Sequence, residues 1–415
     1  MNENIEKRDR FFNILTFVLG ITSAFSVRLI GVIYIAELIC VVCFLFISKR
    51  KDCFPVQLRR MYIFLWIWIA GSVISNWYNQ VPALDFLKGL FFKLFILVIL
   101  PVLYWLLESH PERIFFWLFG TAFSSLLSLY VFPSVIVREF NIAGTHVAIY
   151  YWNSLALAVC ALLYYYGRQI CGCLLLLSWG ICTLFFMSRN LFLIYFIAVF
   201  LVFVFTWYFS KAKKVNFTHC FILFLILAGG LSGAKSTYEY LAEKEILGEA
   251  AYQKYMKQKY GSGEFGLASG RIDFFMALMA LQENPIVGYG DYAKDYTDIR
   301  NRFALKYDLN EISSRTPETR MVPGHSHILG SWVYNGILAL PFWLYCLYLI
   351  VHFLIYHLPK QRGLMLYAAA SCMSCLFNLF FSPFGSRLSL ISYVFFIVVM
   401  QKSEKGPCKV RSLST

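Results

Sequence analysis

The sequence predicts an all-α, polytopic integral membrane protein with about 12 transmembrane helices and one large extracytoplasmic loop that contains helices of its own. Hydrophobic residues make up 59% of the 415 residues and charged residues only 14%, against about 45–50% and about 25% in soluble domains. Apolar runs of about 20 residues, long enough to cross a bilayer, recur along the chain. Lys and Arg gather in alternate loops, which is how positive charge orients membrane spans.

Charged residues and Pro or Gly breaks separate these apolar runs. The expected spans are Phe11–Val27, Leu29–Ser48, Met61–Ser75, Gly89–Leu107, Ile114–Phe132, Val147–Tyr166, Ile170–Met187, Asn190–Phe209, Phe217–Gly233, Ile328–Val351, Gly363–Ser382 and Ser386–Met400. They divide the chain into an N-terminal set of spans (1–187), a central region that includes the large loop (188–345), and C-terminal spans with a tail (346–415).

The charge pattern predicts the orientation of the spans. With the N-terminus inside, the inner loops and tails contain 19 Lys and Arg residues and the short outer loops contain 5. Because cytoplasmic loops carry the excess of positive charge, we expect both termini in the cytoplasm. The net charge of +14 is then a signal of topology, and nucleic acid is not an expected partner.

The large loop, residues 234–327, runs for 94 residues without a spanning stretch and carries 12 cations and 13 anions. Such a balance is typical of a folded, water-facing element. We expect an amphipathic helix over Ser236–Lys259, ended by the Gly-rich segment Gly261–Gly266. A second, strongly apolar helix is expected over Arg271–Glu283, ending at Asn284–Pro285 and packing on the membrane spans.

Two charged residues fall inside expected spans, where ionisable groups are functional candidates. Glu37 and Lys93 are expected to pair if their helices are neighbours, either as a structural ion pair or as a substrate contact. In the large loop, Asp291, Asp295 and Asp298 have a spacing that could line one helix face as metal ligands, but we expect a solvated acidic surface there. No metal and no cofactor is expected.

Four short motifs occur in order around the large loop. They are Ser188-Arg189, Ser269-Gly270-Arg271, the run Asn284-Pro285-Ile286-Val287-Gly288-Tyr289-Gly290, and His325-Ser326-His327-Ile328-Leu329 with Gly336 eleven residues after His325. This order resembles the bacterial O-antigen ligase and O-antigen polymerase superfamily. The resemblance covers roughly residues 188 to 340.

The resemblance implies metal-independent, inverting glycosyl transfer from an undecaprenyl-diphosphate-linked glycan to a sugar hydroxyl, on the outer face of the bacterial cytoplasmic (inner) membrane. It favours a polymerase of O-antigen, capsule or exopolysaccharide, and leaves open a ligase that transfers finished glycan to a lipid or protein acceptor. Besides the lipid bilayer, the implied partners are a flippase and a chain-length regulator. A lipid-linked glycan flippase or sugar transporter is the alternative of another class, although transporters tend to show repeated halves and mid-bilayer sites.

The chemistry of such a transfer suits particular side chains. A departing lipid diphosphate gains negative charge, which the guanidinium groups of Arg189 and Arg271 are suited to bind. The acceptor hydroxyl needs a base, and imidazole titrates nearest neutral pH. The family pattern falls on His325, because Gly336 keeps the expected spacing from it. His327 is the second candidate, since only one of the two can face a common cleft.

Overall fold

The structure, a computed structural model, describes residues 3–23, 25–28, 32–47, 54–108, 110–130, 148–185, 189–208, 229, 232–233, 235–260, 272–307, 320–324, 326–361, 363–381 and 397. Helices dominate these residues. The longer ones are α1 (Glu3–Thr22), α2 (Ile35–Ile47), α3 (Val56–Tyr78), α4 (Ala83–Leu107), α5 (Ile114–Tyr130), α7 (Ala148–Tyr165), α8 (Gln169–Phe185), α9 (Arg189–Phe203), α11 (Glu249–Tyr260), α12 (Ile272–Glu283), α13 (Ile299–Lys306), α14 (His327–Asn335), α15 (Leu340–Tyr356) and α16 (Met365–Phe381).

Short elements connect some of these helices. Strands β1 (Ser26–Arg28) and β2 (Val32–Tyr34) form an antiparallel hairpin between α1 and α2. The one-turn elements are η2 (Pro111–Arg113), η3 (Val204–Tyr208), η5 (Ile337–Ala339) and η6 (Leu358–Lys360). Within the described residues the all-α class is therefore confirmed, with this small hairpin as its β structure.

Three of the described helical segments are both long and apolar enough to cross a membrane: Val56–Tyr78, Ala83–Leu107 and Ile337–Tyr356. Shorter apolar helices of 10–17 residues occur at Ile35–Ile47, Trp152–Tyr165, Gln169–Leu184, Asn190–Thr206 and Met365–Phe381. All eight segments overlap expected spans. A total of about 12 spans stays a prediction, because several of the expected spans lie wholly or partly outside the described residues.

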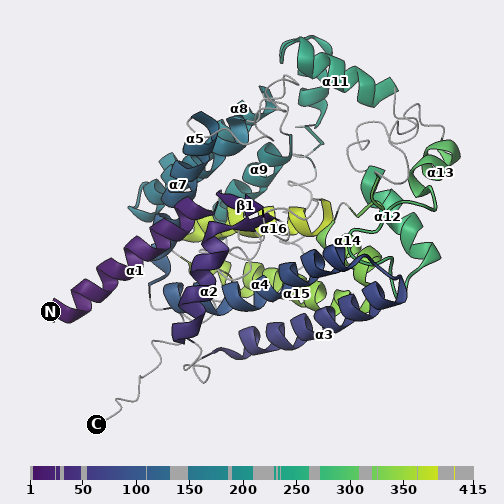
Figure 1. The fold of residues 1–415 in the computed structure, drawn as a ribbon. Helices are drawn as coiled ribbons and strands as arrows, with labels where there is room; N and C mark the ends of the chain where they lie inside the picture. The colour runs from purple at the N-terminus through teal and green to yellow at the C-terminus, as the bar shows by residue number, and fades with distance from the viewer. Residues whose placement is uncertain are drawn as a thin grey trace, which may run out of the picture.

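Two groups of helices meet at α16 (Figure 1). In one group α1, α5, α7, α8 and α9 pack in succession, and in the other α2 and α3 pack on α4 while α15 packs on α3. The helices α1 and α5 cross at Gly20 and Gly120, where a Cβ on Gly20 would lie 2.5 Å from the carbonyl oxygen of Trp117. Small residues allow such close helix crossings, as is common in membrane proteins.

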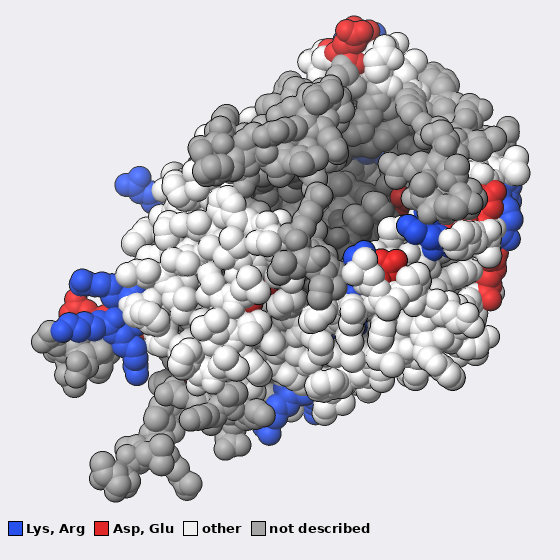
Figure 2. All heavy atoms as spheres, in the orientation of Figure 1, with Lys and Arg blue, Asp and Glu red and all other residues white. Residues whose placement is uncertain are grey.

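The distribution of charged side chains on the surface is compatible with helices that span a membrane. On the face shown in Figure 2, blue and red side chains gather near the N-terminal end of α1, around α12 and α13 and at the top of the view, and blue side chains lie at the lower edge. A broad uncharged surface lies between these groups. Exposed large apolar side chains are frequent on the described helices, among them Phe46, Trp66, Trp77, Leu174 and Tyr348. An uncharged band of this kind is what a lipid-facing surface requires.

The first expected helix of the large loop is in fact two helices. Residues 235–243 are helical, the chain turns at residues 244–247, and α11 starts at Glu249. Gly248 adopts φ +89° and Glu245 φ +57°, and left-handed residues of this kind end helices. The prediction of one continuous helix was wrong, because the apolar spacing continues across a turn that interrupts the backbone.

The second expected helix is confirmed. It is α12, Ile272–Glu283, within one residue of the expected start. Its buried side chains Ala277, Ala280 and Leu281 pack with Leu329 and Val333 of α14. This burial explains why a helix in the loop is so apolar.

The tenth expected span is broken. The chain forms α14, ends it at Gly336 with φ +72° and ψ −172°, passes through η5, and continues as α15 from Leu340. The expected single helix over Ile328–Val351 was therefore wrong, because hydropathy reports burial in lipid and carries no information about the backbone conformation at Gly336.

Candidate functional site

The structure describes the four predicted site residues unequally. Arg271 and His325 lie outside the described residues, and so does the side chain of Arg189, whose backbone begins α9. His327 is described as the first residue of α14. It is buried, and its ring lies 5.2 Å from the ring of Trp343, centroid to centroid.

Burial also determines the titration of His327. Desolvation lowers the pKa of its imidazole to about 3, because a buried site disfavours the charged form. An imidazole with this pKa is neutral at physiological pH and binds a proton weakly. His327 is therefore poorly suited to accept a proton, and the role of His325 stays a prediction.

Two of the predicted residues are followed by segments that meet at one place. Phe274, three residues after Arg271, has its ring centroid 5.8 Å from that of Phe381 at the end of α16. Ser326, directly after His325, donates its hydroxyl to the carbonyl of Leu379 at 2.7 Å. The starts of α12 and α14 therefore lie against the same end of α16.

The start of α9, which carries Arg189, packs in a different apolar cluster. Phe192 lies there with Leu184 of α8 and with Tyr238, Ala242 and Tyr255 of the large loop. Contacts among the described residues thus bring the starts of α12 and α14 to the same end of α16. The position of the Arg189 side chain relative to these two helix starts stays a prediction.

The motif at residues 284–290 binds the break after α14. Tyr289 N donates to Val333 O at 2.8 Å, Gly290 N donates to Tyr334 O at 2.8 Å, and Ile337 N donates to Ile286 O at 3.0 Å. A helix that ends within apolar surroundings leaves backbone groups without helical partners. The 284–290 motif supplies those hydrogen-bond partners. Its backbone is therefore needed where Gly336 ends α14.

Two glycines make this contact possible. A Cβ on Gly288 would lie 2.6 Å from Gly336 N, and a Cβ on Gly336 would lie 2.7 Å from Val287 O. Both glycines also have positive φ, +77° and +72°, a region that side chains disfavour. The two backbones therefore approach so closely that a larger residue at either position must displace them.

A buried polar network follows directly after the motif and is centred on Asp291. Its Oδ1 accepts hydrogen bonds from Lys93 Nζ at 3.0 Å and Asn335 Nδ2 at 2.9 Å. Its Oδ2 accepts from Ser72 Oγ and Asn76 Nδ2, both at 2.7 Å, and from Lys93 Nζ at 3.1 Å. The backbone N–H of Asp291 also donates to Asn76 Oδ1 at 2.7 Å. One carboxylate thus connects α3, α4 and α14.

These contacts keep Asp291 charged. Burial by itself raises the pKa of its carboxyl, but the Lys93 ammonium and the hydrogen bonds from Asn335, Asn76 and Ser72 outweigh burial and hold the pKa below its usual value. The carboxylate approaches α4 at Gly89, where a Cβ would lie 2.6 Å from the Cβ of Asp291. Gly89 therefore makes room for the ion pair.

Two sequence-based expectations need correction at this point. The expected solvated surface is wrong for Asp291 and Asp295, which are 8% and 0% exposed. The carboxylate that pairs with Lys93 is that of Asp291, whereas Glu37 Oε2 accepts a hydrogen bond from Tyr34 N at 3.0 Å. Sequence spacing could not show this pairing, because the two partners lie 198 residues apart.

A second ion-pair network fixes the segment before α13. Asp295 accepts hydrogen bonds from Ile299 N and Arg300 N at the start of that helix. Buried Arg320 places its Nε 3.1 Å from Asp295 Oδ2 and also pairs with Asp298. Each of Asp291, Asp295 and Asp298 thus pairs with a cation of the chain itself. Among the described residues no group of three or more His, Cys, Asp or Glu is placed to hold a metal ion.

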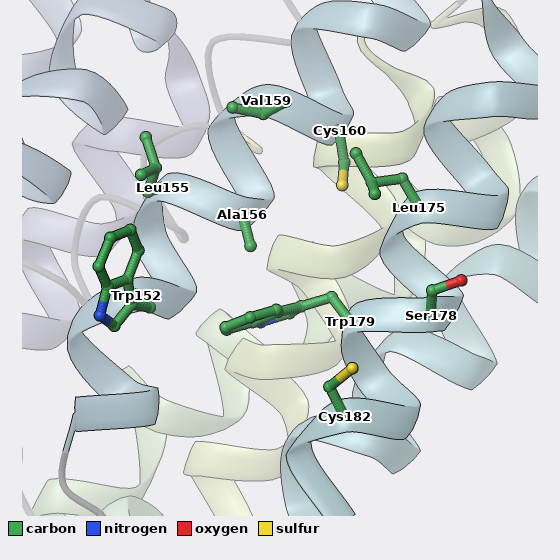
Figure 3. Close-up of a pocket in the computed structure, with 9 residues that line it drawn as sticks. All are labelled: Trp152, Leu155, Ala156, Val159, Cys160, Leu175, Ser178, Trp179 and Cys182. Carbon is green, nitrogen blue, oxygen red and sulfur yellow. The ribbon is translucent and has the colours of Figure 1, made fainter.

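An apolar cavity of about 300 Å³ lies between α7 and α8 (Figure 3). Its lining residues are Trp152, Leu155, Ala156, Val159, Cys160, Leu175, Ser178, Trp179 and Cys182. None of these side chains is charged, and the Ser178 hydroxyl points away from the Trp179 ring. The cavity therefore offers apolar volume and no set of groups for acid–base chemistry.

Sequence reasoning missed the partners of Asp291. Ser72 and Asn76 are polar residues spaced i, i+4 within an apolar run, so they share one helix face. That spacing was a usable signal of a buried polar stripe. It did not indicate which distant carboxylate the stripe would bind.

The features described so far define a class of protein, an α-helical protein with segments long and apolar enough to span a membrane and a buried ion pair between helices. Comparison with known proteins adds no family to this class. No family model matches the chain, and no curated protein sequence matches it.

Proposed function

We propose that the protein is a glycosyltransferase of the bacterial cytoplasmic membrane, which extends a surface polysaccharide on the outer face from an undecaprenyl-diphosphate-linked donor. The observation that carries the proposal is the contact between the described segments that contain or adjoin three of the four motifs. The 284–290 segment hydrogen-bonds to the break after α14, α14 starts two residues after His325, and α12, which follows Arg271, packs on α14. The described segments beside three of the four motifs thus pack together, which supports the proposal of a common site, while the start of α9 packs in another cluster.

The proposed topology has about 12 spans, with both termini in the cytoplasm and residues 234–327 outside. Contacts between distant segments are compatible with it. Asn79, at the expected outer end of α3, donates to the carbonyl of Gly288 in the large loop at 2.9 Å. Asp9 and Arg113, both expected inside, pair at 2.9 Å. Each contact joins two segments that the charge pattern assigns to the same side.

In the proposed reaction the acceptor hydroxyl attacks the anomeric carbon of the donor sugar from the side opposite the diphosphate, which inverts that carbon. His325 takes the hydroxyl proton as the carbon–oxygen bond forms. The bond to the lipid diphosphate breaks, and Arg189 and Arg271 stabilise the charge that the leaving group gains. The products are the extended glycan, with its new glycosidic bond, and free undecaprenyl diphosphate.

Reconstitution tests this proposal and its alternatives. The purified full chain in liposomes, supplied with lipid-linked repeat units and no gradient, is expected to make longer lipid-linked glycan. His325→Ala is expected to abolish extension, and the matched control His110→Ala, a half-exposed histidine that pairs with Glu112, is expected to retain it. Movement of the donor across the bilayer without new glycosidic bonds would instead identify a flippase.

A deletion strain separates polymerase from ligase. Loss of a polymerase leaves single repeat units on the final acceptor, because ligation continues. Loss of a ligase leaves finished polymer on the lipid carrier. Glycan analysis of the lipid-linked and surface fractions therefore distinguishes the two, and we expect single repeats.

A further inference from the structure

We infer that Asp291 is a positioning residue of the transferase, holding the broken end of α14 against the α3–α4 hairpin and thereby fixing the start of α14 beside the acceptor site. This inference rests on the proposed function. It is carried by the network of Asp291 with Ser72, Asn76, Lys93 and Asn335.

The network has no donor left on Lys93 for a substrate. An ammonium group has three N–H donors, and Lys93 Nζ contacts Gly89 O at 3.1 Å and both oxygens of Asp291. The group also lies 5.5 Å from the centre of the Trp68 ring, and Lys93 is 1% exposed. A closed, buried arrangement of this kind is suited to holding helices and unsuited to binding a diphosphate.

The network acts on α14 through one end of that helix. Asn335, its last residue, donates to Asp291 at 2.9 Å and accepts from Trp68 Nε1 at 2.8 Å. Ser75 of α3 donates to the carbonyl of the preceding residue, Tyr334, at 2.8 Å. At the other end, Ser326 binds α16. Both ends of α14 are therefore held from outside the helix.

The short length of α14 makes this restraint effective at its start. Nine residues of α-helix span about 13 Å, so a tilt of only about 5° at Asn335 moves the first turn by about 1 Å. A misplacement of about 1 Å at a reacting group can slow a reaction about 100-fold. Loss of the network should therefore lower the transfer rate even when the protein stays folded.

The decisive variant is the double substitution Lys93→Met with Asp291→Asn, which removes both buried charges together and leaves neither unpaired. The matched control is Asp85→Asn, which breaks a half-buried Lys–Asp pair (2.8 Å) near the start of α4 and leaves the Lys88 ammonium over the Tyr292 ring. Both are assayed in liposomes with lipid-linked repeat units, and by hydrogen exchange of the full-length protein.

The double variant is expected to transfer glycan about 10- to 100-fold more slowly, with the KM for the donor within about twofold of wild type. Hydrogen exchange should accelerate in residues 284–298 and 326–336 and stay unchanged in α4. The control should match wild type in transfer rate, in the KM for the donor and in hydrogen exchange. Wild-type transfer by the double variant, or unchanged exchange in residues 284–298, overturns the positioning role.

A milder variant covers the case in which the double variant does not accumulate. Ser72→Ala removes one hydrogen bond of 2.7 Å from Asp291 and keeps the ion pair. It is expected to slow transfer several-fold and to accelerate exchange at residues 288–291, and wild-type behaviour in both overturns the inference. Absence of transfer by the wild-type protein overturns the proposed function instead, and exchange alone then decides whether Asp291 holds this segment.

Discussion

Replacing Gly336 by alanine tests whether the break after α14 depends on close backbone contact. The conformation of Gly336, φ +72° and ψ −172°, is open essentially to glycine alone and costs another residue roughly 1–3 kcal/mol. The new Cβ would also lie 2.7 Å from Val287 O and closer still to Ile286 O. Overlap with backbone atoms in a packed site costs about 1–3 kcal/mol more. Together these effects predict a loss of about 2–6 kcal/mol in the free energy of unfolding.

The control for this substitution is Gly248→Ala. Gly248 has φ +89°, and a Cβ there would meet nothing within 4 Å, so only the backbone term of roughly 1–2 kcal/mol applies. Unfolding of the purified proteins by SDS in mixed micelles measures both losses. Equal losses in Gly336→Ala and Gly248→Ala would show that the close contact with the 284–290 segment contributes nothing to stability.

Three further predictions concern other parts of the molecule. His325→Ala should abolish surface polymer at normal protein level, and Arg271→Lys should be nearly as poor because a point charge lacks the guanidinium fork; normal polymer length in the histidine variant contradicts its role as base. Arg320→Met leaves a buried carboxylate without its cation and should cost about 3–5 kcal/mol of unfolding free energy, whereas Arg302→Met, which breaks a half-exposed pair, should cost less than about 1 kcal/mol. His327 has a pKa of about 3 when folded and about 6.5 when unfolded, so the unfolded chain binds more protons between these values and stability is lost as pH falls below about 6.5. The wild type should lose roughly 2 kcal/mol between pH 7 and pH 5, and an equal loss in His327→Gln would show that the histidine is not its source.

Much of the helical content was predictable because burial in lipid requires long apolar runs. The bounds of α12 followed from its local signals, with Asn284–Pro285 at its end. The breaks at Gly248 and Gly336 were not predictable from hydropathy, because both are set by backbone conformation within sequences that remain favourable for helix. Gly336 in particular depends on contacts with a segment about 50 residues away.

The candidate site was predictable to a different extent. Arg189, Arg271 and His325 follow from motifs and from the chemistry of a departing diphosphate, and they stay predictions. The role of Asp291 was misjudged because its sequence surroundings are those of a polar loop. Its burial is decided by Lys93, a residue that no local pattern connects to it.

The separation of Lys93 and Asp291 has a consequence for biosynthesis. A ribosome that adds 5–20 residues per second needs about 10–40 s to make the 198 residues between them. In the proposed topology, α4 carries throughout that interval a lysine whose carboxylate partner has not yet been made. In that topology the pair forms only once the large loop has folded and brought Asp291 back to α4. Formation of the pair thus depends on a segment that is made late, and a chain interrupted before residue 291 leaves the Lys93 charge without this carboxylate.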